Sequence, residues 1–285
     1  NAVLTADIDM GGAVWETPIS YWSNSRGGHN YYGTFDGQGH CISNLSIEGQ
    51  DNDINCGGLF GLGQAGSMIK NLTIKDCIFT ALYSIGGIAG EWYGEMENCV
   101  TMNVKISGSA MYGLIGYGGT VRYSFTDYPD SYRPDATTAI NTYGSNDLEE
   151  ADYASGKLCY LLNKGLETPV WYQNIGEDAL PVLDASHKTV NATKFNCDGT
   201  LADDCAFTNE AVQAESPAHQ YEGACCVNCG AVNPDYTCEE EDGCYLLGNW
   251  DDLYWFFAQL NAGNNALNGK LTADIDNFTY PMMMK

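Results

Sequence analysis

The residues best suited to chemistry in this 285-residue chain are cysteines and one histidine in its last third. Seven of the twelve cysteines lie between residues 191 and 245, namely Cys197, Cys205, Cys225, Cys226, Cys229, Cys238 and Cys244. His219, Cys226 and Cys229 follow an H-x6-C-x2-C pattern, and thiolate and imidazole are the ligands of structural zinc. Because Cys197 completes a four-ligand set, the sequence predicts a zinc site at Cys197, His219, Cys226 and Cys229.

Disulfides are the alternative to zinc. Apolar residues are sparse around these cysteines, so a covalent or metal crosslink has to hold the segment together. Zinc would leave four thiols for two disulfides, those of Cys205, Cys225, Cys238 and Cys244. Without zinc, an exported chain favours disulfides throughout, and the odd thiol is left over or pairs with Cys159. The sequence leaves both alternatives open.

A second candidate site is an aromatic segment near the start of the chain. It contains Trp15, Tyr21, Trp22, Tyr31 and Tyr32. Sugar rings stack on aromatic faces, so these five residues predict a glycan-binding platform. The alternative is that they pack a long loop against the rest of the fold, because aromatic side chains dominate ordinary packing energy.

The charge balance argues against several classes of function. Lys and Arg number 12 against 37 Asp and Glu, and the net charge of −25 repels nucleic acid and anionic membranes. No apolar run approaches the ~20 residues that span a bilayer, so no membrane insertion is expected in this segment. A lyase of acidic polysaccharide would want a basic groove, and Asp7 and Asp9 are expected to hydrogen-bond turn backbone. We therefore predict no catalytic residues and no enzyme.

A short repeat runs through residues 40–126. The phrase Ile42–Leu45 is echoed by Ile69–Leu72, then more faintly from Met96 and Val121, at steps of 27, 27 and 25. Glycine-rich phrases separate these segments, and β-branched and aromatic residues dominate without helical spacing. The pattern predicts a mainly β fold, a short right-handed parallel β-helix (β-solenoid) whose turns stack at ~4.8 Å.

Stacked turns place equivalent residues in columns. One predicted column holds Leu45, Leu72, Cys99 and Ser124, another holds Cys56, Ile85 and Met111, and Cys77 aligns with Val104. The three cysteines in these columns are expected to be core residues, because a free buried cysteine behaves as a small hydrophobe. Glycine is expected at the corners between strands, where it adopts positive φ at little cost.

After Tyr143 the short β-type repeat ends and segments with helical spacing begin. We divide the chain into a parallel β-helix (1–145), a helical and strand cap over its open end (146–190), a small Cys-rich module (191–245), and a capping helix with the first strand of the next repeat unit (246–285). Acidic first turns and apolar spacing predict helices within 147–154 and 156–165. A further helix is predicted over Trp250–Leu260, with Asn249 as its N-cap.

The two ends of the chain repeat each other. Seven of nine positions agree between Asn1–Asp9 and Asn268–Asp276 when the two phrases are aligned without a gap. This duplication predicts one whole unit followed by the opening of the next, an arrangement typical of stalks and fibres. The expected partners are neighbouring copies of the same repeat unit, joined or assembled head to tail.

Several phrases resemble the GLUG-motif β-helix proteins of bacterial cell surfaces. They are GTFDGQGH (Gly33–His40), ISNL (Ile42–Leu45) and GGLFG (Gly57–Gly61), while Ala154–Leu158, Leu161–Asn163, Trp171–Gln173, Pro181–Asp184, Cys197–Thr200 and Cys226–Gly230 look like the rest of that module. The module occurs in large, repetitive secreted proteins of gut and rumen anaerobes, so the resemblance implies a secreted, extracellular surface protein and an adhesin role. Tyr112 departs from the motif, where the first glycine of a pair would stand.

We therefore predict an extracellular structural or adhesive tandem-repeat protein that continues or assembles head to tail as a stalk, fibre or filament. Twelve cysteines in an acidic chain also favour an oxidising compartment. The alternatives are a glycan-binding surface module built on residues 15–32 and a polysaccharide-active β-helix enzyme. Structural zinc is the one cofactor under consideration, and glycans or host surface proteins are the further partners.

Overall fold

The computed structural model describes residues 1–48, 53–129, 138–212 and 214–275. Strands make up 39% of the described residues and helices 9%, so the predicted mainly β class is confirmed. Two compact units can be distinguished, and each is treated by itself. Unit 1 comprises Asn1–Asn191 with Phe207–Ala211, and unit 2 comprises Ala192–Ala206 with Val212–Lys285. The four-part division made from the sequence stays a prediction.

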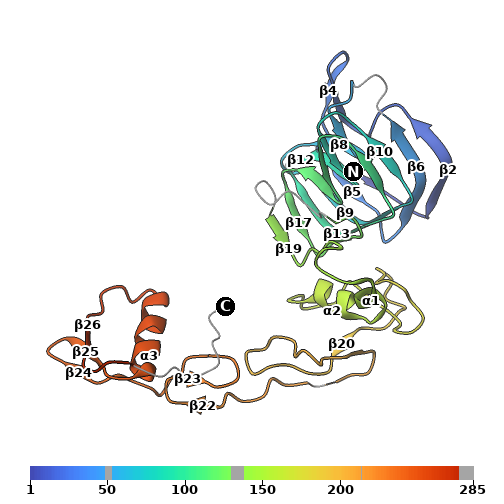
Figure 1. Cartoon of the computed structure of the whole chain (residues 1–285). Helices are drawn as coiled ribbons and strands as arrows, with labels where there is room; N and C mark the ends of the chain where they lie inside the picture. The colour runs from blue at the N-terminus through green and yellow to red at the C-terminus, as the bar shows by residue number, and fades with distance from the viewer. Residues whose placement is uncertain (49–52, 130–137, 213, 276–285) are drawn as a thin grey trace. The chain divides into compact units, whose positions relative to one another are not determined.

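A large sheet dominates unit 1, and every ladder in it is parallel (Figure 1). Among the described residues its eleven strands are β1 (Ala2–Val3), β2 (Ile8–Trp15), β5 (Thr34–Asp36), β6 (Cys41–Glu48), β9 (Met68–Lys75), β10 (Ile78–Thr80), β13 (Glu95–Met102), β14 (Lys105–Ser107), β17 (Thr120–Arg122), β18 (Phe125–Thr126) and β19 (Thr138–Ile140). The predicted parallel pairing is therefore confirmed.

Two smaller parallel sheets accompany the large one. They consist of β7 (Cys56–Gly57), β11 (Ser84–Gly86) and β15 (Ala110–Tyr112), and of β8 (Phe60–Gly63), β12 (Ala89–Trp92) and β16 (Ile115–Tyr117). The strands β3 (Tyr21–Ser23) and β4 (Gly27–His29) form an antiparallel hairpin. The hairpin occupies the aromatic segment that the sequence placed in a loop.

The strand register repeats with a nearly constant step in all three sheets. Glu95 of β13 lies beside Met68 of β9. In one small sheet Ser84 lies beside Cys56 and Ala110, and in the other Ala89 lies beside Phe60 and Ile115. The predicted pairs Cys99 with Leu72 and Ile85 with Met111 are confirmed. These steps stay close to the period of the short repeat, as expected for a ladder built from it.

The first of the predicted steps is wrong. The echo between Ile42–Leu45 and Ile69–Leu72 is real in sequence, yet Ile42 lies beside Ile74, and Leu45 lies beside Ala13. Cys56 likewise lies beside Ser84 rather than Ile85. The step from β6 to β9 exceeds the predicted period because the segment between the two strands is longer. Sequence similarity between the two strands does not reveal this difference in spacing.

Asparagine and aspartate, rather than glycine, occupy two corners of the large sheet. Asn71 and Asn98 have φ values of 53° and 52°, and Asn98 Nδ2 donates to Asn71 Oδ1 at 3.0 Å. A second ladder joins Asp76 to Asn103, with Asn103 Nδ2 donating to Asp76 Oδ1 at 2.6 Å. Asn and Asp tolerate the left-handed region, and their side chains satisfy one another from turn to turn. The expectation of glycine at these corners is therefore wrong.

Replacement of Asn98 should separate the contribution of its side-chain hydrogen bond from that of its left-handed backbone conformation. Asn98→Ala is expected to lower the free energy of unfolding by about 2 kcal/mol, because it loses the ladder hydrogen bond and strains a left-handed residue. Asn98→Gly should cost only about 1 kcal/mol, because glycine relieves the backbone strain. Urea denaturation measures both variants, and equal losses would contradict a backbone role for Asn98.

The glycine phrases serve close approach between neighbouring segments. A Cβ at Gly86 would lie 2.2 Å from the carbonyl oxygen of Ala89 and 2.3 Å from that of Leu114. A Cβ at Gly90 would lie 2.6 Å from the backbone nitrogen of Gly57. Any larger side chain would push these backbones apart, so glycine is required although neither residue has positive φ.

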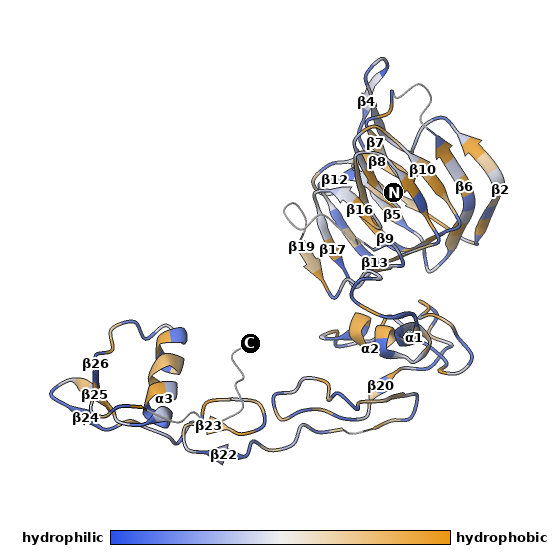
Figure 2. Cartoon of the chain, viewed as in Figure 1, coloured by the Kyte–Doolittle hydropathy of each residue, from blue (hydrophilic) through white to orange (hydrophobic). Residues whose placement is uncertain are grey.

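The core of unit 1 fills the space bounded by these sheets. Its largest fully buried side chains include Trp92, Phe60 and Phe79. Cys56, Cys77 and Cys99 are 3%, 1% and 0% exposed, which confirms the prediction that they are core residues. Figure 2 shows the apolar residues along the strands β6 and β10 of this core.

A second core packs two short helices against the end of the large sheet. The helices are α1 (Glu150–Ala154) and α2 (Lys157–Asn163), within the predicted ranges. Trp171 is 1% exposed in this core, and its Nε1 donates to the carbonyl oxygen of Tyr123 at 3.0 Å. The helical segment thus covers apolar residues of the sheet such as Phe125. A small strand pair, β20 (Asn191–Ala192) and β21 (Phe207–Thr208), follows.

Unit 2 consists of short strands and one helix. They are β22 (Tyr221–Glu222), β23 (Cys225–Cys226), β24 (Glu240–Glu241), β25 (Cys244–Leu247), α3 (Trp250–Asn261) and β26 (Gly269–Leu271). The predicted helix and its cap are confirmed, since Asn249 Oδ1 accepts from the N–H of Asp252 at 3.0 Å. The predicted strand of the second copy is limited to β26, and Asp276 lies outside the described residues. Each helix in the described part of the chain is too short or too polar to cross a bilayer.

Candidate metal centre

Two turns and a hairpin of unit 2 bring the four predicted ligands together. Cys197 lies in a turn closed by the bridge between Phe195 and Leu201. The strands β22 and β23 pair antiparallel, with Tyr221 beside Cys226, so His219 is carried toward the turn that follows Cys226. That turn closes with the N–H of Gly230 donating to the carbonyl oxygen of Cys226 at 2.8 Å. Ligands from separate parts of the sequence thus converge.

The spacing of the ligand atoms is that of a tetrahedral site. The thiol sulfurs, with one ring nitrogen of His219, all lie within 4.8 Å of one another. The sulfurs of Cys197 and Cys226 are 3.7 Å apart, and Cys229 Sγ lies 3.4 Å from His219 Nδ1. Tetrahedral zinc, with Zn–S of about 2.3 Å and Zn–N of about 2.0 Å, sets ligands about 3.8 Å (S···S) and about 3.5 Å (S···N) apart. The cluster therefore fits a Cys3His zinc site.

The electrostatics of the cluster differ from one thiol to the next. Desolvation disfavours the thiolate of Cys226, but the backbone N–H groups of Asn228 and Cys229 and the ring of His219 lower its pKa to about 6. The pKa of Cys197 is raised to about 12, first by its hydrogen bond with Cys229 and then by desolvation. Without a metal, neighbouring thiols share hydrogen bonds, and one can ionise only at the expense of the other. A bound metal ion would instead coordinate each sulfur as a thiolate, because thiolate is the metal-binding form.

The structure contains none of the predicted disulfides. All twelve cysteines are free thiols, and the 3.7 Å between Cys197 and Cys226 sulfurs is far beyond the bond length of about 2.05 Å. Two of the four cysteines expected to pair contact backbone oxygens instead. Cys238 Sγ donates to the carbonyl oxygen of Asp252, and Cys205 Sγ donates to that of Ala206.

The five aromatic residues predicted to bind glycans do not form one platform in the described structure. Tyr31 packs into the core, where its ring contacts Phe60 at 5.2 Å and Trp92 at 5.9 Å between centroids. Tyr21 packs edge-on against His29 of the hairpin. Trp15, Trp22 and Tyr32 are 37%, 49% and 68% exposed. Tyr21 and Tyr31 therefore pack against other rings of the fold. The three exposed rings are the ones that could contact a glycan.

A groove in unit 1, missed at the sequence level, is flanked by two histidine–aspartate pairs. His40 Nδ1 lies 3.1 Å from Asp7 Oδ1, and His187 Nδ1 lies 2.7 Å from Asp178 Oδ2. His40 and His187 both line the groove, together with Asp184. The pKa of Asp7 is lowered, chiefly by the N–H of Cys41. One pair lies near the start of the chain and the other beyond residue 177, and the two pairs share no motif. No sequence signal therefore marks the groove.

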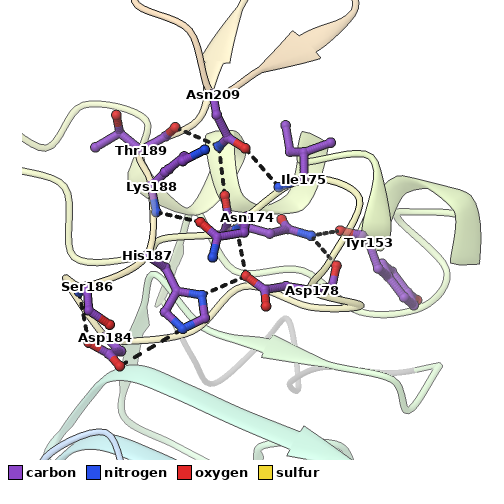
Figure 3. A network of polar contacts seen from close by, with 11 residues as sticks. Tyr153, Asn174, Ile175, Asp178, Asp184, Ser186, His187, Lys188, Thr189 and Asn209 are labelled. Atoms are coloured by element: carbon purple, nitrogen blue, oxygen red, sulfur yellow. Dashed lines mark hydrogen bonds and ion pairs between the residues drawn. The ribbon is translucent and has the colours of Figure 1, made fainter.

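His187 belongs to a polar network that ties the end of unit 1 together (Figure 3). Asn209 Oδ1 accepts from the N–H of Ile175 at 2.8 Å, and its Nδ2 donates to the carbonyl oxygens of Gln173 and Thr189. His187 lies between the carboxylates of Asp178 and Asp184. The network immobilises loops that lack regular strands, which indicates a structural role for this histidine.

The network predicts a pH dependence of stability. Desolvation opposes ionisation of Asp178, but the N–H of Asn174 and the ring of His187 hold its pKa below the ordinary value of 3.8. Since the folded pKa is depressed, the stabilisation is present above pH 3.8 and lost as the pH falls through the folded pKa. Asp178→Asn should therefore reduce the loss of unfolding free energy on acidification. Glu177→Gln is the matched control: Glu177 is an exposed acid next to Asp178, and its carboxylate is not part of the network, so an equal effect would contradict the assignment.

Comparison with known proteins finds a similarity to part of a much longer protein. The chain is 30% identical to Halomucin of Haloquadratum walsbyi (strain DSM 16790 / HBSQ001) over 149 residues, which is 49% of this chain. The matched part spans only 2% of Halomucin, which is therefore many times longer than this chain. No family model and no solved structure matches the chain.

Proposed function

We propose that this chain is a unit of an extracellular structural tandem-repeat protein whose first part is a right-handed β-solenoid. The observation that carries the proposal is the recurrence of parallel partners at a nearly constant sequence step in all three sheets of unit 1. One coil per period, with the large sheet bent at its two corners and the two small sheets as further faces, gives the strands parallel neighbours in the next coil. Stacked repeats of this kind serve as spacers and display surfaces.

A surface location has independent support. Half of this chain is similar to a small part of Halomucin, whose great length fits a repetitive surface protein. The net charge of −25 keeps such a chain soluble and repels anionic surfaces. The resemblance to GLUG-motif proteins of gut and rumen anaerobes agrees with an adhesive stalk or fibre. The absence of catalysis is part of the proposal, because the paired carboxylates near the coils hydrogen-bond backbone and asparagine side chains.

In this proposal unit 2 is a small module held by zinc. Its residues bury little apolar surface, and the Cys3His cluster supplies the missing crosslink. One zinc ion on Cys197, His219, Cys226 and Cys229 would replace a hydrophobic core, as in other small metal-held modules.

The sequence of the parent gene tests the tandem-repeat function. We expect further copies of the Asn1–Asp9 phrase, each preceded by a Cys-rich module, at spacings near the interval that separates Asn1 from Asn268. A gene that contains this module once, between unrelated domains, would contradict the proposal.

Glycan recognition is the second candidate function, favoured by the exposure of Trp15, Trp22 and Tyr32. A glycan array is expected to show binding that falls at least tenfold in Trp22→Ala, because loss of a stacked ring costs about 1.4 kcal/mol or more. Tyr83→Ala is the matched control, because Tyr83 is 58% exposed and belongs to another part of unit 1. Binding that is absent, or lost equally in both variants, would rule out this candidate.

A further inference from the structure

Unit 2 contains an aromatic helix whose side chains all remain at least partly exposed. The helix α3 carries Trp250, Leu253, Tyr254, Trp255, Phe256, Phe257 and Leu260, and none of its residues is buried. Phe257 is 48% exposed, and Figure 2 shows the apolar residues along α3. A helix of this composition is built to be covered by a partner.

The strand beside α3 belongs to the second copy of the duplicated phrase. Its residues Gly269–Leu271 form β26, which pairs in parallel with β25, Leu271 beside Leu247. When Asn268 is aligned with Asn1, β26 corresponds to Ala2–Leu4, and β1 in unit 1 covers the same phrase. One sequence therefore occurs in two settings, beside β25 in one and beside β5 in the other.

The two settings use opposite edges of that strand. In β26 the N–H of Thr272 donates to Leu247, and the carbonyl oxygen of Asn268 accepts from Tyr245. These residues correspond to Thr5 and Asn1. In the first copy it is the N–H of Leu4, on the other edge, that donates to the carbonyl oxygen of Asp36. Because successive residues of a strand point their backbone groups to alternate sides, one phrase can bind β25 and β5 at once.

We propose that β25 and α3 form a receptor for the first strand of a repeat copy, so that the Cys-rich unit of one copy caps the solenoid of the next. This inference rests on the proposed tandem-repeat function. Within one chain the receptor is filled by β26, and in a second copy the occupant is Asn1–Asp9. The edge facing the receptor in that copy is open in the described structure, because β1 pairs there with β5 alone.

Side chains at the contact match this occupant. Ala2 corresponds to Gly269, where an added Cβ lies 3.0 Å from both Leu247 Cδ1 and Phe256 Cζ, so a small shift brings the methyl group into apolar contact. Val3, which corresponds to the charged Lys270, is 59% exposed in unit 1. Leu4 lies only partly buried at the end of the solenoid core. A capping helix would cover this end of the core.

Strand exchange between full-length chains tests the receptor. Thr272→Pro removes the N–H that binds β26 to β25, so the opened receptor should accept β1 of a second copy, and chains should associate without limit. Sedimentation velocity up to millimolar concentration is the measurement, since linked units face each other at about millimolar effective concentration. The second substitution Thr5→Pro, in the same chain, should restore the monomer. Leu271→Pro is the matched control, because its N–H faces away from β25.

Competition by a peptide with the sequence of Asn1–Asp9 supplies a second measurement, on the unmodified chain. The labelled peptide should bind at millimolar concentration by displacing β26, and the same peptide with proline in place of Thr5 should not bind. A Thr272→Pro chain that stays monomeric while α3 remains protected from hydrogen exchange would overturn the receptor. So would failure of the peptide to bind, or association that persists with Thr5→Pro. None of these results bears on the copy number in the parent gene, which tests the function separately.

Discussion

Chelation is expected to remove one zinc ion per chain and to unfold unit 2 while unit 1 stays folded. The four ligand atoms already lie at tetrahedral spacing, so the bound ion would require little rearrangement. Structural zinc contributes about 10 to 16 kcal/mol of apparent binding free energy in small metal-held domains, far more than the sparse apolar contacts of unit 2. Elemental analysis and a thiol titration before and after chelation are the measurements. The thiols of Cys197, Cys226 and Cys229 should become reactive.

Single substitutions sharpen the same test. Cys226→Ser should lower zinc content to background and abolish the chelator response, because it removes a buried ligand of the set. Cys205→Ser is the matched control, since Cys205 lies in the same unit and outside the cluster, and it should retain the full zinc content. A native protein without zinc, in which mass spectrometry finds the three cluster thiols oxidised, would instead establish the disulfide alternative.

The convergence of the three cysteines and His219 could be predicted because its sequence signal is local. The C-x2-C turn and the nearby His219 fix three ligands within one short stretch of sequence. Cys197 was predicted as the fourth ligand because it completes the set, and the structure brings it to the cluster through a separate turn. The histidine–aspartate pairs of the groove in unit 1 had no such signal. His40 and Asp7 are distant in sequence and meet only because β2 lies beside β6.

The short repeat predicted the parallel pairing of the strands, but it predicted their register only in part. Similar sequence phrases align correctly where the period is constant, as for Leu72 and Cys99. The alignment of similar phrases fails for Leu45, because a longer segment between β6 and β9 shifts the strand register while the phrases stay similar. The corner residues also escaped prediction. Glycine is the default at positive φ, but asparagine adds a hydrogen bond to its equivalent on the neighbouring strand, an advantage that appears only once the strands are in register.

Loss of Trp92 is expected to cost unit 1 about 3 to 5 kcal/mol of unfolding free energy, the range for truncation of a large buried aromatic residue. Trp92 is 0% exposed and packs against Phe60 and Tyr31, with centroids 5.6 and 5.9 Å away. Its Nε1 also donates to the carbonyl oxygen of Glu95 at 3.2 Å. Trp92→Ala therefore opens a cavity in the core and loses this hydrogen bond. Urea denaturation followed by circular dichroism measures the loss.

Two further variants show whether the effect belongs to this packing site. Trp22→Ala removes an indole that is 49% exposed, so it should cost less than about 1 kcal/mol. Gly63→Ala leaves Trp92 in place but puts a Cβ 2.2 Å from its Cε3, so it should displace the ring and destabilise unit 1 by about 1 to 3 kcal/mol. Together the two substitutions test the stack from both sides. Equal losses for Trp22→Ala and Trp92→Ala, or a neutral Gly63→Ala, would mean that Trp92 is not packed in the core of unit 1 as its burial and ring contacts indicate.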